Sequence, residues 1–268
     1  MEMWSDDQMR SIHKMLNPRS IAVVGASPKG GYGGRLLTAV LKAKDRVRIY
    51  PVNPNYDEIA DTKCYRSIAE LPEAPDLVGI VVPYDKVLPV MKECAAKKAG
   101  SAIVISAGFA ERGIAARLDL QKEVGAYAKE SGLRITGPNC LGLANVRDDI
   151  WATASSRTLG GLTGHIALVC QSGATAFGPF LLRAVDAGIG LSHIISTGNE
   201  TDLDEIHQVC DIISSVDPAT PLFLQPLSGT SGSIDISVAH LLRLQEAASA
   251  RLEDVRVIPQ MHLMLGAL

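Results

Sequence analysis

Short apolar runs alternate with amphipathic segments along the first half of the chain. Five runs bounded by glycine, proline or polar residues predict strands over residues 20–25, 46–52, 77–82, 101–106 and 133–136. Helical spacing of apolar residues predicts helices over residues 34–42, 84–97 and 115–131. Strands that are apolar on both faces and alternate with amphipathic helices are typical of a parallel sheet covered by helices. We therefore predict an α/β fold that begins with a Rossmann-like domain over residues 1–145.

The alternation restarts after residues 146–163, a segment rich in Ser, Thr, Gly and Asp without a clear period, which we interpret as a linker. Strands are then predicted over residues 165–170, 191–197, 221–225 and 255–258, and helices over residues 173–187, 203–214 and 238–251. This pattern indicates a second, smaller, flavodoxin-like α/β domain over residues 164–268. Its last residues, 262–268, are mostly apolar and lack a cap, so we expect the domain to be incomplete.

Composition and charge narrow the class of protein. The chain has 268 residues, of which 47% are hydrophobic and 21% charged, as is typical of a globular protein. A net charge of -3 without a Lys/Arg cluster argues against a nucleic-acid partner. No apolar run approaches the ~20 residues of a membrane span, and the polar N-terminus lacks a signal-peptide core. Five widely spaced cysteines without a Cys-x-x-Cys pair indicate reduced thiols and no metal site. We expect a cytoplasmic protein that binds no membrane.

The loop between the first predicted strand and helix, residues 25–34, is rich in glycine. Glycines there let backbone N–H groups and the helix N-terminus face an anion, usually a phosphate. Ser27 occupies the second glycine position of a G-x-G-x-x-G pattern, and Asn53 and Asn55 stand where a ribose-binding acid is expected. NAD is therefore disfavoured, and the loop is predicted to hold the phosphates of another nucleotide-containing ligand. The alternative is a purely structural turn.

Polar or glycine-containing loops also follow the other predicted strands. They are Pro83 with Tyr84, Ser106 with Ala107 and Gly108, and Gly137 with Pro138, Asn139 and Cys140. Ligands of open α/β sheets bind beyond the carboxyl ends of the strands, so this shared edge favours a binding site. For Asn139 and Cys140 the alternative is a core position, because buried cysteines are common.

Two loops of the second domain carry further candidates. Ser172, Gly173 and Thr175 lie at the start of the predicted helix 173–187, where they form an anion site or where Ser172 simply caps the helix. Glu200 follows the next strand; a carboxylate there can orient a histidine or a metal, and the alternative is a solvated loop acid. A G-x-S-x-G elbow is absent, which argues against a serine nucleophile.

Taken together, the motifs resemble the α-type, CoA-binding portion of the NDP-forming (ADP-forming) acyl-CoA synthetases, within the succinyl-CoA synthetase superfamily. The resemblance covers about residues 8–220 and is carried by SIAVVGAS, VNPNYDEI, VGIVVPYDKV, AIVISAGFAE, ITGPNCLGLAN, GHIALVCQSGATAFG and ISTGNETDLDE. It implies that coenzyme A is the ligand and that Gly25, Ser27 and Gly33 hold its phosphates and adenine half. It further implies that the path of CoA is lined by Val52, Asn53, Pro54, Pro83, Ser106, Ala107 and Gly108.

The resemblance also implies catalysis through a phosphohistidine. In that family the nucleotide phosphorylates a histidine, which passes the phosphoryl group to a carboxylic acid, and CoA then attacks the acyl phosphate. The phosphate would lie between two helix N-termini, here at Asn139-Cys140 and at Ser172-Gly173-Ala174, and Glu200 would hydrogen-bond the histidine. The NTP and its Mg would be held by a β-type ATP-grasp subunit or domain and not by this chain.

Three departures from the family pattern leave a second hypothesis open. Asn55 replaces a lysine that commonly assists CoA binding, and the resemblance fades after about residue 220. The family's histidine motif is absent, which leaves His262 as the candidate for the phosphorylated residue. The alternative is therefore a non-catalytic or truncated module that binds CoA or acyl-CoA. An NAD-dependent oxidoreductase is disfavoured because the ribose acid is missing.

Overall fold

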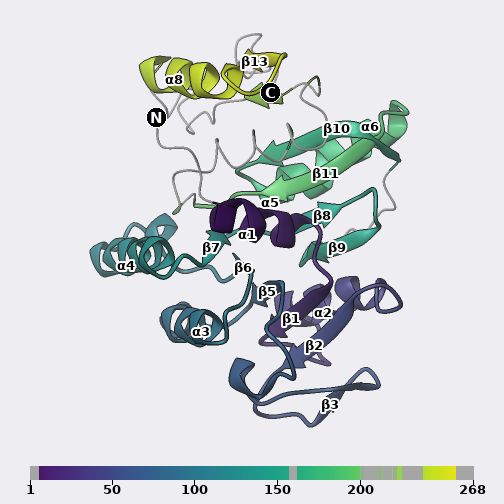
Figure 1. Cartoon of the computed structure of the whole chain (residues 1–268), viewed down its shortest axis with the longest axis vertical. Coiled ribbons are helices and arrows are strands. Elements are labelled where there is room, and N and C mark those ends of the chain that lie inside the picture. Colours follow the sequence, from purple (N-terminus) through teal and green to yellow (C-terminus); the bar gives the residue numbers. More distant parts are fainter. Residues whose placement is uncertain are drawn as a thin grey trace. The chain divides into compact units, whose positions relative to one another are not determined.

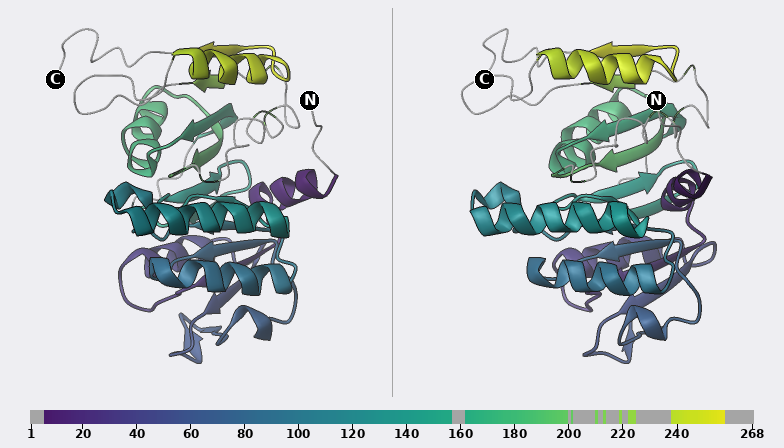
Figure 2. Two further views of the ribbon diagram at one scale, coloured as in Figure 1. Left: turned by 90° about the vertical axis from the view of Figure 1, so that its left-hand side faces the viewer. Right: turned by 60° about the vertical axis from the view of Figure 1, so that its left-hand side comes forward.

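The computed structural model describes residues 6–156, 162–199 and 238–257, together with residues 201, 210, 213, 219 and 222–224 (Figures 1 and 2). The chain divides into two compact units, one formed by residues 1–164 and 168–203 and the other by residues 165–167 and 204–268. Among the described residues, no helix is both long and apolar enough to cross a bilayer.

A five-stranded parallel sheet forms the centre of the first unit. Its strands are β1 (Ser20–Val24), β2 (Arg48–Val52), β5 (Leu77–Ile80), β6 (Ser101–Val104) and β7 (Arg134–Thr136), in the order β2-β1-β5-β6-β7. Every residue of β1, β5, β6 and β7 is buried, which explains why β1, β5 and β6 are mostly apolar in the sequence. The strand order reverses between β1 and β5, the point at which doubly wound sheets bind their ligands.

Helices cover this sheet as the sequence predicts. They are α2 (Tyr32–Leu41), α3 (Tyr84–Ala96) and α4 (Ala115–Ser131). Helices α3 and α4 pack beside each other (Figures 1 and 2). Their residues Met91 and Val124 belong to the same buried core as Val78 and Val104. The connections include the hairpin β3 (Glu58–Ile59) with β4 (Thr62–Lys63) and the 3-10 turns η1 (Ile68–Glu70) and η2 (Ala110–Arg112).

A second sheet combines strands from both sides of the predicted linker with one strand inside it. Its strands are β8 (Gly142–Asn145), β9 (Ile150–Thr153), β10 (Thr163–Cys170) and β11 (Leu191–Ser196), in the order β10-β11-β8-β9. Strand β8 is antiparallel to both β9 and β11, so residues before the predicted boundary at 145 belong to this sheet. The segment 146–163, which we interpreted as a linker, contains strand β9; the sequence did not reveal it because Ile150, Trp151 and Ala152 are only three consecutive apolar residues, although Trp151 is buried.

Two helices differ from the predictions. Helix α1 (Asp6–Leu16) was not predicted because its sequence is mostly polar, yet Ile12, Met15 and Leu16 are buried. The single helix predicted over residues 173–187 is broken into α5 (Gly173–Thr175), a π-helical segment η3 (Ala176–Phe180) and α6 (Leu181–Asp186). The break lies at Gly178, which has non-helical φ and ψ angles of -105° and -108°, before Pro179.

The described part of the second unit contains the elements that its sequence predicts. Strand β12 (Leu222–Leu224) is parallel to β13 (Val255–Val257), and α8 (Val238–Ser249) precedes β13. Most of the predicted helix 203–214 lies outside the described residues. The five cysteines, all of them among the described residues, form no disulfide with one another.

Candidate functional site

The glycine-rich loop lies at the carboxyl end of β1, where the strand order reverses. Gly25 has a φ of +86°, and a Cβ atom on it would lie 2.0 Å from the carbonyl oxygen of Val81, just beyond β5. A Cβ atom on Gly33, in the first turn of α2, would lie 2.0 Å from the carbonyl oxygen of Gly25. The loop therefore packs directly against its neighbours on both sides, and only glycine allows such close approach.

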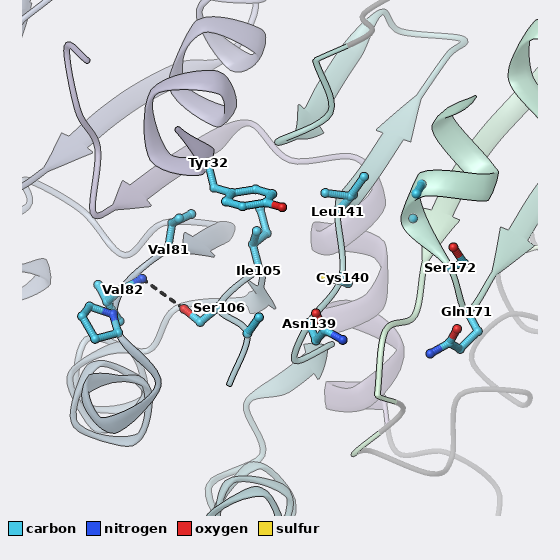
Figure 3. A pocket seen from close by; sticks show the side chains of 14 residues that line it. Tyr32, Val81, Val82, Ile105, Ser106, Asn139, Cys140, Leu141, Gln171 and Ser172 are labelled. Atoms are coloured by element: carbon cyan, nitrogen blue, oxygen red, sulfur yellow. Dashed lines mark hydrogen bonds between the residues drawn. The ribbon is translucent and has the colours of Figure 1, made fainter. Parts of the chain in front are cut away.

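Side chains of two predicted site residues hold these loops together. The Asn53 Nδ2 atom donates to the carbonyl oxygen of Ala26 at 2.7 Å, and its Oδ1 atom accepts from the N–H of Asn55 at 3.0 Å. The Ser106 Oγ atom accepts a hydrogen bond from the N–H of Val82 at 3.0 Å (Figure 3). Asn53 and Ser106 thus shape the edge of the sheet through hydrogen bonds within the protein.

A cavity of about 580 Å³ opens at this edge, and we call it the switch-point cavity. Figure 3 shows Val82 and Ser106 on one side, Gln171 and Ser172 on the other, and Asn139 and Cys140 between them. Its lining residues are Tyr32, Val81, Val82, Pro83, Ile105, Ser106, Ala107, Asn139, Cys140, Leu141, Gln171, Ser172, Gly173 and Ala174. All of them belong to the first unit.

Eight predicted site residues meet in this cavity. They are Pro83, Ser106, Ala107, Asn139, Cys140, Ser172, Gly173 and Ala174. Gly25, Gly33, Val52, Asn53, Pro54 and Gly108 do not line it, and Ser27 lines a separate cavity. Glu200 and His262 lie outside the described residues. Sequence reasoning missed Tyr32, Ile105, Leu141 and Gln171, although each lies within or beside a loop that it singled out.

The 137–141 segment forms one wall of the switch-point cavity. Gly137 has a φ of +101°, and a Cβ atom on it would lie 2.3 Å from the carbonyl oxygen of Val104. Asn139 has a φ of +60° and donates its backbone N–H to the carbonyl oxygen of Ser106 at 2.9 Å. Cys140 is 3% exposed, and its Sγ atom lies 3.4 Å from the carbonyl oxygen of Val104. Cys140 therefore combines both alternatives: it is packed in the core and also borders the cavity.

The opposite wall begins at Ser172. Its Oγ atom accepts hydrogen bonds from the N–H of Thr175 at 3.3 Å and from the Thr175 hydroxyl at 3.0 Å. The Ser172 hydroxyl therefore caps the helix that follows it, which is the alternative to an anion site. A Cβ atom on Gly173 would lie 2.5 Å from the Cβ atom of Leu141 and 2.8 Å from the Ser196 Oγ atom. Gly173 thus lets the first turn of α5 approach the 137–141 segment.

Glu111 ties two of the surrounding loops together. Its carboxylate accepts hydrogen bonds from the N–H groups of Gly108 at 2.5 Å and Phe109 at 3.1 Å, and from the Asn199 Nδ2 atom at 2.6 Å. Burial alone would raise the pKa of Glu111, but the hydrogen bonds from Gly108, Asn199 and Phe109 outweigh it and lower the pKa below its usual range. The ionised carboxylate is therefore the form that the loops require.

Asn199 extends the connection to the cavity wall. Its Nδ2 atom also donates to the Gln121 Oε1 atom at 2.9 Å, and its Oδ1 atom accepts from the Asn139 Nδ2 atom at 3.1 Å. The Asn199 amide thus joins α4, the loop after β6 and the wall after β7. Sequence reasoning missed Glu111 and Gln121, because nothing in their immediate sequence indicates these partners.

Replacing Glu111 by glutamine is expected to lower the free energy of unfolding at pH 7 by about 1 kcal/mol, because the amide keeps one acceptor oxygen and solvent screens this partly exposed group. The folded-state pKa is lowered, so the contribution of the carboxylate is present above its usual pKa of 4.5 and is lost as the pH falls below that value. Urea denaturation of both proteins at several pH values should show their difference shrinking below about pH 4.5. A difference independent of pH would contradict this account.

Comparison with known proteins assigns both halves of the chain. Residues 19–146 match the family described as CoA binding domain, and residues 163–224 match the family described as succinyl-CoA ligase like flavodoxin domain. The chain is 36% identical over 203 residues to an ADP-forming acetate–CoA ligase of Methanocaldococcus jannaschii, which covers 76% of this chain and 28% of that protein. It is 37% identical over 188 residues to the alpha subunit of ADP-forming acetate–CoA ligase II of Pyrococcus furiosus, covering 70% of this chain and 40% of that subunit.

The chain belongs to the ADP-forming acyl-CoA synthetase family. It corresponds to the CoA-binding, α-type portion, and it spans less than half the length of these two relatives. Among solved structures it is similar to the apo form of the dinucleotide forming acetyl-coenzyme A synthetase 1 of Ca. Korarchaeum cryptofilum, with 31% identity and a TM-score of 0.78 over 96% of this chain and 54% of that chain. The predicted family and the predicted pair of domain types, Rossmann-like and flavodoxin-like, are confirmed.

Proposed function

We propose that this chain is the CoA-binding part of a ligase that converts a carboxylic acid, CoA and an NTP into acyl-CoA, an NDP and phosphate. The observation that carries the proposal is the switch-point cavity, in which loops from both family-matched segments meet. Its position beyond the carboxyl ends of β5, β6 and β7 is where α/β sheets of this type bind ligands. Its volume of about 580 Å³ is within the range of small-molecule sites.

The residues around the cavity suit the parts of CoA. Val81, Val82, Pro83 and Ile105 provide an apolar surface for the pantetheine arm. The glycine-rich loop with Gly25, Ser27 and Gly33 would hold the phosphates and adenine half, beside Val52, Asn53, Pro54 and Gly108. The thiol would then lie towards Asn139 and Cys140, so that the acyl group is transferred between the two walls of the cavity.

The same two walls would hold the transferred phosphoryl group. Backbone N–H groups of Gly173 and Ala174, in the first turn of α5, would face its oxygens from one side. The helix N-terminus predicted at Asn139-Cys140 is not formed, because strand β8 begins at Gly142 and the Asn139 N–H already donates to Ser106, so this turn would only border the phosphoryl group from the other side. A phosphohistidine would enter between them, with Glu200 as its hydrogen-bond partner and His262 as the candidate of this chain. The histidine attacks the terminal phosphorus of the NTP and releases the NDP; a carboxylate oxygen then takes the phosphoryl group, and the CoA thiolate displaces phosphate from the acyl carbon.

The NTP and its Mg would be bound by a β-type ATP-grasp partner. Two relatives from Pyrococcus furiosus are named alpha subunits, which supports a division of the enzyme between chains. Incubation of this chain with ATP, Mg and a β-type partner should place acid-labile phosphate on a histidine, and a His262→Asn variant should lose it. Phosphate on no histidine, with CoA still bound, would favour the alternative of a non-catalytic CoA-binding module.

CoA binding itself can be tested by filling the cavity. Ala174 is exposed and lines the cavity, so Ala174→Trp should weaken CoA binding at least tenfold in calorimetry while leaving the melting temperature nearly unchanged. Ala116→Trp, at an exposed position in the first turn of α4 outside the cavity, is the matched control and should bind CoA normally. Equal CoA affinity of both variants would place the site elsewhere, and heat from NADH instead of CoA would restore the oxidoreductase hypothesis.

A further inference from the structure

A second cavity of about 240 Å³ lies along α2, and we call it the α2 cavity. Gly34, Arg35, Thr38, Ala39 and Lys42 line one side of it, and this spacing places them on one face of the helix. The loop residues 27–30, and Ser155 and Ser156, which follow β9, complete the lining. Helix α2 packs against β9, so both walls belong to one packed region of the first unit.

The lining of the α2 cavity is cationic and rich in hydroxyl groups. Lys29, Arg35 and Lys42 supply three basic side chains, and hydroxyls come from Ser27, Thr38, Ser155 and Ser156. None of the described residues that line it carries a carboxylate, and α2 contains no acidic residue along its length. The whole chain carries a net charge of -3, so this local concentration of positive charge is opposite in sign to the net charge of the protein. Cations with hydroxyl donors are the groups that bind phosphate.

The α2 cavity is separate from the switch-point cavity but has a contact with it. The guanidinium of Arg35 lies 5.7 Å from the centre of the Tyr32 ring, and Tyr32 lines the switch-point cavity. Ser27, a residue of the glycine-rich loop, lines the α2 cavity and accepts the N–H of Lys29 at 3.0 Å. One face of the loop region therefore borders the switch-point cavity, and the other borders a cationic cavity.

We propose that the α2 cavity binds a terminal phosphate group, that is, a phosphate monoester dianion. Arg35 supplies the planar fork that matches two phosphate oxygens, and Lys29 and Lys42 supply two further point charges in the same lining. Such a group has two possible sources: the 3′-phosphate of a CoA molecule that also occupies the switch-point cavity, or free phosphate and small phosphorylated molecules. The first source rests on the proposed function, and the second does not.

The test compares CoA with dephospho-CoA, which lacks only the 3′-phosphate, and uses inorganic phosphate as the free probe. Wild-type protein should bind CoA at least tenfold more tightly than dephospho-CoA at low salt, and the double variant Arg35→Gln/Lys42→Gln should reduce this ratio below about threefold. Lys44→Gln is the matched control, because Lys44 is exposed and lies two residues from Lys42 but does not line the cavity. It should keep the wild-type ratio.

The outcomes separate the two sources and the two proposals. Equal binding of CoA and dephospho-CoA, with phosphate shifting the backbone NMR signals of residues 27–35 in the wild type but not in the double variant, would support the site with a free phosphate as its ligand. That result would stand even if CoA bound nowhere, in which case only the proposed function fails. A double variant that matches wild type with all three ligands, or a Lys44→Gln variant that loses as much as the double variant, would overturn the proposal.

Discussion

Replacing Gly25 by alanine is expected to abolish CoA binding and to lower the free energy of unfolding by about 2–4 kcal/mol. The left-handed φ of +86° costs an alanine roughly 1 kcal/mol by itself. The larger part comes from the Cβ atom, which would lie 2.0 Å from the carbonyl oxygen of Val81. That oxygen belongs to backbone just beyond a fully buried strand, so the loops after β1 and β5 must separate at the point where the strand order reverses.

Gly132→Ala is the matched control because it introduces the strain of a positive φ without a steric clash of the Cβ atom. Gly132 has a φ of +72° at the end of α4, and a Cβ atom there would meet nothing within 4 Å. Alanine at Gly132 should therefore cost only about 1 kcal/mol and leave CoA binding unchanged. The measurements are urea denaturation and calorimetric titration with CoA for both variants. If Gly25→Ala behaved like Gly132→Ala in both, the close contact between the two loops would not govern the site.

The parallel sheet could be predicted from the sequence because its strands are buried on both faces. Val23, Val78 and Ile103 lie in continuous apolar runs between glycine or polar loops. Such a run indicates a buried strand even when the neighbouring strand in the sheet is not known. The strands β8 and β9 lacked this signal. Neither has more than three consecutive apolar residues, and β8 pairs with β11, in which His193 lies opposite Asn145, 48 positions away in the sequence. Such long-range pairing leaves no signal in the local sequence.

The candidate site, too, could be predicted from the sequence only in part. The loops at Ser106, Asn139 and Ser172 could be found because each follows an apolar run, and the parallel topology brings the ends of β6 and β7 to one edge. The hydrogen bonds of Asn199 with Gln121 and Asn139 could not be found, because amide side chains accept many partners and carry no spacing signal. The α2 cavity also escaped prediction, since its cations face two serines that follow an unpredicted strand.

Acidification from pH 7 towards pH 4 is expected to destabilise the first unit through one buried histidine. His193 lies on β11, is 3% exposed, and has an Nε2 atom that finds no hydrogen-bond partner among the residues that the structure describes. Burial, with a smaller contribution from the positive charge of Arg147, lowers the pKa of His193 from 6.5 to about 4, although Asp148 opposes the shift. The folded protein therefore keeps the imidazole neutral where the unfolded chain protonates it.

The sign of the pH dependence follows from the number of protons that the folded and unfolded states bind. Between pH 6.5 and about pH 4 the unfolded chain binds a proton that the folded protein does not, so the free energy of unfolding falls as the pH falls through that window. The full shift corresponds to a loss of about 3 kcal/mol. Urea denaturation at half-unit pH steps should give a clearly shallower pH dependence for His193→Phe, which removes both the titration and the unpartnered nitrogen. His13→Gln, which removes an exposed histidine of α1, is the control. Equal slopes for wild type and His193→Phe across this window would show that another group causes the acid sensitivity, and that the imidazole finds a proton acceptor within the fold.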